Sequence, residues 1–119
     1  MVVDDMATSR GLITQSLDEI GIQNYVWEKD GQDAFKTLSS KPVHLVISDY
    51  NMPNMDGLQL LHSLRSNTTT SRIGFVLVTG RADNAILEKG KQLSMNNYLL
   101  KPFSTDQMRT CLERVVGKL

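Results

Sequence analysis

Residues 45–57 read LVISDYNMPNMDG, an apolar run that ends in Asp49 and passes at once into a polar turn. Burying a carboxylate is costly, so a strand that ends in one usually presents it to a pocket at the edge of a sheet. We therefore expect a strand over residues 43–48, with Asp49 beside a functional site.

Three other apolar segments also end in polar side chains. Residues 2–3 run into Asp4 and Asp5, residues 75–78 into Thr79, and residues 98–100 into Lys101. The carboxyl ends of parallel strands lie along one edge of a sheet, where ligands of open α/β folds bind. That edge would hold three carboxylates, a hydroxyl and an ammonium, which suit a divalent cation and a phosphoryl group.

Composition limits the class of protein. The chain has 119 residues, the size of one domain. Its 13 basic and 13 acidic residues give no net charge, so the total charge favours neither nucleic acid nor an anionic membrane. The apolar runs are too short to span a bilayer, and the first residues lack the features of a signal peptide. The one cysteine, Cys111, fits a reducing compartment, so we expect a cytoplasmic protein.

Strand-like and helix-like patterns alternate along the chain. Strands are expected at residues 2–3, 22–27, 43–48, 73–78 and 97–100. Apolar residues at helical spacing follow each strand: Ile13, Leu17 and Ile20; Ala34, Phe35 and Leu38; Leu58, Leu61 and Leu64; Ala82, Ile86, Gly90 and Leu93; Met108, Leu112 and Val115. Five strands alternating with five helices predict an α/β fold with a doubly wound parallel sheet, covered by helices on both faces.

Capping residues indicate where several helices begin and end. Gly21 is placed to end the first helix, and Asp56 to begin the third. Ser104 and Gln107 have the spacing of a capping box at the start of the last helix.

The motifs at the strand ends resemble the signature blocks of response-regulator receiver domains. They are VVDD at residues 2–5, SDYNMPNMDG at 48–57, VTG at 78–80 and YLLKPF at 98–103, in the family's order and at its intervals. The resemblance covers residues 1–119 as one receiver domain and is greatest to the stand-alone, CheY-like chemotaxis receivers. It implies a flavodoxin-like five-stranded sheet with strand order 2-1-3-4-5.

The resemblance also implies roles for individual residues. Asp49 would be the phospho-acceptor, which attacks a phosphoryl group and becomes an aspartyl phosphate. Asp5 and Asp49 would bind Mg²⁺ directly, Asp4 through water, and Asn51 through its main-chain carbonyl.

Two further residues would contact phosphoryl oxygens, Thr79 through a hydrogen bond and Lys101 through its charge. Pro102 resembles the family's cis-proline. Tyr98 resembles the family's switch aromatic, whose ring follows Thr79 inward on phosphorylation and changes the surface formed by the last strand and its neighbouring helices.

The function implied is that of a phospho-acceptor in a two-component system, with slow self-dephosphorylation at most and no other enzymatic activity. The phosphodonor would be a CheA-like sensor histidine kinase, and the downstream partner a flagellar-motor switch protein or another protein. A phosphatase is a further candidate partner. The alternatives within the class are a phosphate sink or phosphorelay intermediate, and a receiver detached from an output domain.

Two other classes share a similar sheet. An aspartyl phosphatase typically has a second aspartate two residues after its nucleophile, where this chain has Asn51. A flavin-binding flavodoxin has hydroxyl and amide groups after its first strand. Here Asp4 and Asp5 would repel a phosphate unless a metal intervened.

Two features depart from the family pattern. Only Met1, Val2 and Val3 precede the acid pair, where the family usually has a longer strand, and Ser94 stands where the family often has glycine. Structural roles are expected for four remaining residues, namely packing for Trp27 and Cys111 and surface positions for His44 and His62.

Overall fold

The strands form one parallel sheet in the order β2-β1-β3-β4-β5, which confirms the order that the resemblance implied. The computed structural model describes residues 1–81 and 83–119. Within these residues five strands alternate with five helices: β1 (Val2–Val3), α1 (Ala7–Ile20), β2 (Trp27–Glu28), α2 (Gly31–Ser40), β3 (Leu45–Asp49), α3 (Gly57–Ser66), β4 (Gly74–Thr79), α4 (Asn84–Gln92), β5 (Asn97–Leu100) and α5 (Thr105–Val116). None of the helices in the described ranges has the length and apolar character needed to cross a bilayer.

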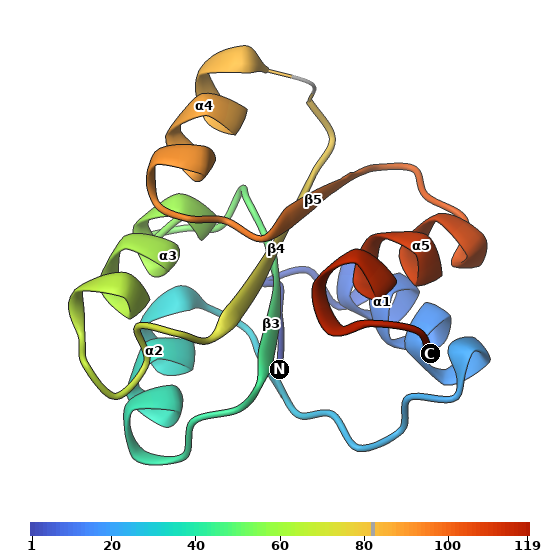
Figure 1. The fold of residues 1–119 in the computed structure, drawn as a ribbon, viewed down its shortest axis with the longest axis horizontal. Coiled ribbons are helices and arrows are strands. Elements are labelled where there is room, and N and C mark those ends of the chain that lie inside the picture. The colour runs from blue at the N-terminus through green and yellow to red at the C-terminus, as the bar shows by residue number, and fades with distance from the viewer. Residues whose placement is uncertain (82) are drawn as a thin grey trace.

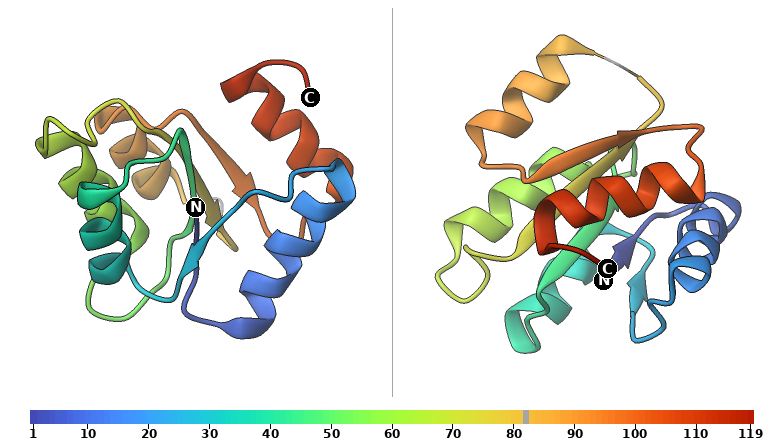
Figure 2. Two further views of the ribbon diagram at one scale, coloured as in Figure 1. Left: turned by 90° about the horizontal axis from the view of Figure 1, so that it is seen from below. Right: turned by 45° about the vertical axis from the view of Figure 1, so that its right-hand side comes forward.

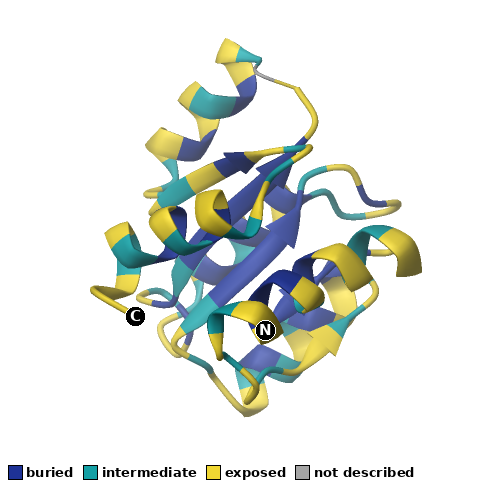
Figure 3. Ribbon diagram, turned by 90° about the vertical axis from the view of Figure 1, so that its right-hand side faces the viewer, coloured by how far each residue is buried: buried dark blue, intermediate teal, exposed yellow. Residues whose placement is uncertain are grey.

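Helices cover both faces of the sheet, with α1 and α5 on one face and α2, α3 and α4 on the other (Figure 1, Figure 2). Side chains of β4 alternate between the two cores. Phe75 and Leu77 belong to the core on the side of α2 and α3, whereas Val76 and Val78 belong to the core on the side of α1 and α5. Figure 3 shows the central strands buried and the outward faces of the helices exposed. The predicted two-faced burial of a parallel sheet is therefore confirmed.

The predicted helix caps are present. Gly21 adopts a left-handed conformation with φ 100° at the end of α1. Asp56 accepts a hydrogen bond from the Gln59 amide at the start of α3, and Ser104 forms a capping box with Gln107 at the start of α5. These caps set the helix boundaries locally.

Strand β2 is shorter than predicted. The sequence predicts a strand over residues 22–27, and in the structure only Trp27–Glu28 forms one. It lies at the edge of the sheet, and its neighbour β1 pairs Val2 with Trp27 and Val3 with Glu28. The Val2 amide donates to the Val26 carbonyl at 2.8 Å and the Asp4 amide to the Glu28 carbonyl at 3.1 Å, which are the bonds that flank this short pairing.

The packing prediction for Trp27 is wrong, because this residue is 51% exposed. The guanidinium of Arg10 lies 3.9 Å from the centroid of its ring, at cation–π distance. An edge strand with so little pairing leaves the ring beside a charged residue of α1 and outside the core.

The fourth helix carries Ile86 and Gly90 as buried residues, as the pattern predicted. Ala82, which the pattern assigned to the same face, lies outside the described residues. After the helix, Ser94 has φ 60°, the left-handed conformation that glycine adopts without strain. Its carbonyl accepts a hydrogen bond from Arg65 Nη2 at 3.0 Å. Ser94 thus adopts a backbone conformation that suits glycine, the residue that the family pattern often has at this position.

Candidate functional site

Asp49 ends β3, where it pairs with Val78 of β4 and is 6% exposed. The turn after it returns to the strand, because the Gly57 amide donates to the Tyr50 carbonyl at 2.8 Å. A Cβ atom on Gly57 would lie 2.6 Å from the Asp49 carbonyl oxygen and 2.7 Å from a Leu77 methyl carbon. Only a glycine leaves room for this approach of α3 to the end of β3.

The carboxylates of Asp4, Asp5 and Asp49 come together at this edge. One oxygen from each lies within 4.8 Å of the others. The parallel pairing of β1 with β3, with Val3 opposite Ser48, brings the two strand ends side by side. Asp4 is fully buried, while Asp5 is exposed. Consecutive residues therefore provide a carboxylate on the buried side of the cluster, from Asp4, and one on its solvent-exposed side, from Asp5.

The buried carboxylate of Asp4 is only half satisfied. Its Oδ1 accepts a hydrogen bond from the Met6 amide at 3.0 Å. Its Oδ2 has no hydrogen-bond partner. Among the buried side-chain nitrogen and oxygen atoms of residues 1–81 and 83–119, no other atom lacks one. A buried hydrogen-bond acceptor without a partner is costly, and no described group of the protein donates to this oxygen. A divalent cation bound among the three carboxylates would bring water molecules that can donate to it.

Lys101 brings the positive charge to the cluster. Its Nζ lies 2.7 Å from Asp49 Oδ1 and donates to Ser9 Oγ at 2.8 Å. Its main-chain amide donates to the Thr79 carbonyl at 2.8 Å, which continues the pairing of β4 with β5. The Lys101–Pro102 peptide bond is cis, as the resemblance implied.

The balance of charge at Asp49 still favours a cation. Burial raises the pKa of the Asp49 carboxyl above its ordinary value of 3.8; contact with Lys101 opposes the rise, and the charges of Asp4 and Asp5 add to it. One ammonium therefore does not compensate for burial together with two neighbouring acids. A further positive charge or a proton at this edge would relieve the site.

The remaining predicted site residues lie around this cluster. Thr79 ends β4 and is 3% exposed, and its Oγ1 accepts a hydrogen bond from the Arg81 amide at 3.2 Å. Asn51 is exposed in the turn two residues after Asp49. The roles of the metal-binding and phosphoryl-binding residues stay predictions.

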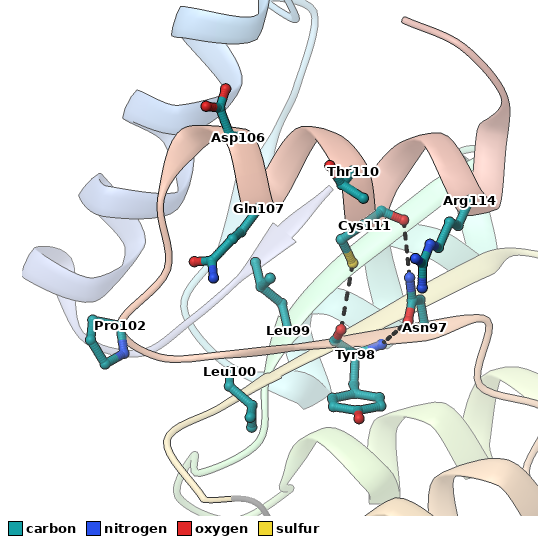
Figure 4. A pocket seen from close by; sticks show the side chains of 10 residues that line it. All are labelled: Asn97, Tyr98, Leu99, Leu100, Pro102, Asp106, Gln107, Thr110, Cys111 and Arg114. Carbon is teal, nitrogen blue, oxygen red and sulfur yellow. Dashed lines mark hydrogen bonds between the residues drawn. The ribbon is translucent and has the colours of Figure 1, made fainter.

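Tyr98 lies on β5 next to the groove between this strand and α5 (Figure 4). Tyr98 is 38% exposed and its ring points away from α5, whereas Leu99 points toward that helix. On the groove side, Cys111 Sγ lies 3.6 Å from the Tyr98 carbonyl. Burial raises the pKa of the Cys111 thiol to about 11, so it is a neutral packing group, as predicted.

Sequence reasoning missed Ser9 and Arg10. Ser9 contacts the ammonium of Lys101, and Arg10 Nη1 donates to the Asp4 carbonyl at 2.9 Å. No sequence spacing marks them, because Asp5 precedes α1 and the contact of Ser9 with Lys101 joins residues 92 positions apart.

Comparisons with known proteins agree with this geometry. The family model described as response regulator receiver domain matches residues 1–113. The chain is 39% identical over its full 119 residues to a probable chemotaxis protein CheY of Rhizobium etli, of which it covers 92%. It is 30% identical to chemotaxis protein CheY1 of Helicobacter pylori, with 98% of this chain and 95% of the relative covered.

Two solved structures show the same fold. Chemotaxis protein CheY4 of Vibrio cholerae aligns with a TM-score of 0.87 at 24% identity, covering 96% of this chain and 94% of that one. The receiver domain of a Pseudomonas aeruginosa sensor histidine kinase, solved with a magnesium ion coordinated in its active site cleft, aligns with a TM-score of 0.86 at 24% identity. It covers 98% of this chain and 95% of its own.

Proposed function

Because the chain belongs to the response regulator receiver family and is CheY-like, we propose that Asp49 accepts a phosphoryl group from the phosphohistidine of a sensor histidine kinase. Receiver domains are signalling modules of two-component systems rather than conventional enzymes. We propose that residues 1–119 act as one receiver domain in the cytoplasm. The single cysteine supports this location, because it cannot form an internal disulfide and fits a reducing compartment.

The observation that carries the proposal is the ammonium of Lys101, 2.7 Å from Asp49 Oδ1, beside a cluster of three carboxylates. The Asp49 carboxylate attacks the phosphorus, and the donor's imidazole nitrogen leaves. Lys101 offers its charge to one phosphoryl oxygen, and the Thr79 hydroxyl donates a hydrogen bond to another. Phosphoryl transfer needs positioning and charge neutralisation more than it needs covalent help, and these residues provide both.

The donor set fits Mg²⁺. Asp5 and Asp49 would bind it directly, Asn51 through its main-chain carbonyl, and Asp4 through a water that also reaches the unpartnered Oδ2. When bound, Mg²⁺ supplies positive charge next to the phosphoryl oxygens. The magnesium ion of the Pseudomonas aeruginosa receiver domain supports this assignment by analogy.

Phosphorylation would change the conformation of β5 and its neighbouring helices. Phosphoryl contacts draw Thr79 inward and the Tyr98 ring follows, which changes the surface formed by α4, β5 and α5. Slow self-dephosphorylation returns the chain to its resting state, and a phosphatase is a candidate for faster return.

The names of the Rhizobium etli and Helicobacter pylori relatives support a role in chemotaxis. We propose a CheA-like kinase as phosphodonor and a flagellar-motor switch protein as partner. Binding of the phosphorylated chain to a peptide of a motor-switch protein tests this choice of partner. A phosphate sink or a phosphorelay intermediate would not bind such a peptide.

The phosphorylation itself is tested by incubating the protein with acetyl phosphate and Mg²⁺ and measuring its intact mass. We expect one acid-labile phosphoryl adduct, which Asp49→Ala abolishes. Asp56→Asn is the matched control, because Asp56 caps α3 and asparagine also caps helices. An adduct that survives in Asp49→Ala would contradict the proposal.

A further inference from the structure

The hydroxyl of Ser9 has no role in the chemistry described so far. Ser9 lies near the start of α1 and is partly buried, and its Oγ accepts a hydrogen bond from Lys101 Nζ at 2.8 Å. The two residues are 92 positions apart in the chain. Their contact forms where the start of α1, which packs against α5, meets the segment that joins β5 to α5.

The contact with Ser9 restricts the position of the Lys101 ammonium. The ammonium is held between Asp49 Oδ1 and Ser9 Oγ, and it has one more N–H than these two contacts use. A lysine side chain is long and flexible, so two fixed acceptors restrict where its charge lies. The ammonium therefore has a defined position, 2.7 Å from Oδ1 of Asp49 and 2.8 Å from Oγ of Ser9.

The Ser9 hydroxyl therefore acts on the site through Lys101. Resting on the proposed function, we propose that Ser9 is a positioning residue that holds the Lys101 ammonium beside Oδ1 of Asp49, where its charge meets an incoming phosphoryl oxygen.

Three variants of α1 test this inference. Ser9→Ala removes the hydroxyl, Ser9→Thr keeps it, and Thr8→Ala is the matched control because Thr8 is an exposed neighbour in the same helix. The phosphorylation rate is measured over a range of acetyl phosphate concentrations at saturating Mg²⁺.

We expect Ser9→Ala to lower the maximal rate about 3- to 10-fold, the effect of one lost hydrogen bond, with unchanged half-saturating acetyl phosphate and Mg²⁺ affinity. Ser9→Thr should restore the rate, and Thr8→Ala should match the parent protein. A rate in Ser9→Ala equal to that of the parent overturns the inference. So does an equal loss in Ser9→Thr and Ser9→Ala, because the hydroxyl is then irrelevant.

A second readout needs no phosphodonor. The ammonium resonance of Lys101, observed by ¹H–¹⁵N NMR in the Mg²⁺-free protein, should be protected from exchange in the parent and in Ser9→Thr and be lost in Ser9→Ala. If the parent protein takes up no phosphoryl group, the proposed function fails, and this signal still decides whether Ser9 positions Lys101. Equal protection in all three proteins overturns the positioning role.

Discussion

The ammonium of Lys101 lies 2.7 Å from Oδ1 of Asp49, so the ends of β5 and β3 are joined by charge across β4. The carboxyl of Asp49 nevertheless has a raised pKa, because burial and the charges of Asp4 and Asp5 outweigh the attraction of Lys101. The metal-free site therefore carries unfavourable negative charge, and that charge should be visible in protein stability.

Replacing Asp49 with asparagine should stabilise the metal-free protein at pH 7. The amide removes the buried charge and its repulsion from two acids, which raises the free energy of unfolding. Saturating Mg²⁺ should shrink the difference, since the parent then has a compensating cation. Urea unfolding of both proteins in EDTA and in Mg²⁺ measures it, and a lower unfolding midpoint for metal-free Asp49→Asn would contradict it.

The same pKa shift predicts how stability depends on pH. The folded state holds the Asp49 proton more tightly than the unfolded state, so the unfolding free energy of the metal-free protein falls as pH rises from the ordinary value of 3.8 through the raised folded pKa. The advantage of Asp49→Asn over the parent should vanish below that window and be complete above it. Unfolding curves of both proteins between pH 3 and 8, roughly the range in which acidic side chains and histidine titrate, give the difference directly.

Gly57 should not tolerate a side chain. A methyl group there would meet the Asp49 carbonyl oxygen at 2.6 Å, and backbone cannot move aside as a side chain can. We expect Gly57→Ala to lower the free energy of unfolding by about 1–3 kcal/mol and to slow phosphorylation by displacing Asp49.

The control for Gly57→Ala is Gly11→Ala in α1, where a Cβ atom would meet nothing within 4 Å. That substitution should raise the free energy of unfolding by about 0.5–1 kcal/mol, because alanine favours a helix over glycine. Equal effects at the two positions would mean that crowding at Asp49 is not what Gly57 avoids.

Ser94→Gly should stabilise the protein modestly. The left-handed conformation at φ 60° strains serine and suits glycine, whereas glycine also adds entropy to the unfolded chain. We expect a net gain of about 0.5 kcal/mol in the free energy of unfolding. Ser94→Ala retains the strain and should give no gain, so thermal unfolding of the two variants isolates the backbone contribution.

Tyr98 is 38% exposed, and its ring should become buried when beryllofluoride and Mg²⁺ mimic phosphorylation. Protection of tyrosine ring resonances from a paramagnetic additive measures this change. Tyr25, whose hydroxyl donates to Asp18 of α1 at 3.1 Å, is the internal control and should not respond. Unchanged exposure of Tyr98 would rule out its role as the switch.

Much of the fold could be predicted because its signals are local. The apolar runs that end in Asp49, Thr79 and Lys101 correctly indicated strands, and the alternation with helices correctly indicated a parallel sheet. Since parallel strands align their carboxyl ends, the gathering of Asp4, Asp5, Asp49 and Lys101 followed from the pattern as well.

Other features needed the packed molecule. The extent of β2 and the exposure of Trp27 depend on the pairing of β2 with β1 at the edge of the sheet. The contact of Ser9 with Lys101 joins residues that no sequence spacing relates.

The amino-acid sequence by itself determined which residues end the strands, where the caps lie, and hence which chemistry collects at one edge of the sheet. Those properties depend on side-chain type and on the short periods of helix and strand. Only the tertiary structure decided the pairing length of β2, the room beside Gly57 and the second acceptor of Lys101. Each of these depends on the distance between segments that are remote in the chain, and close packing sets that distance.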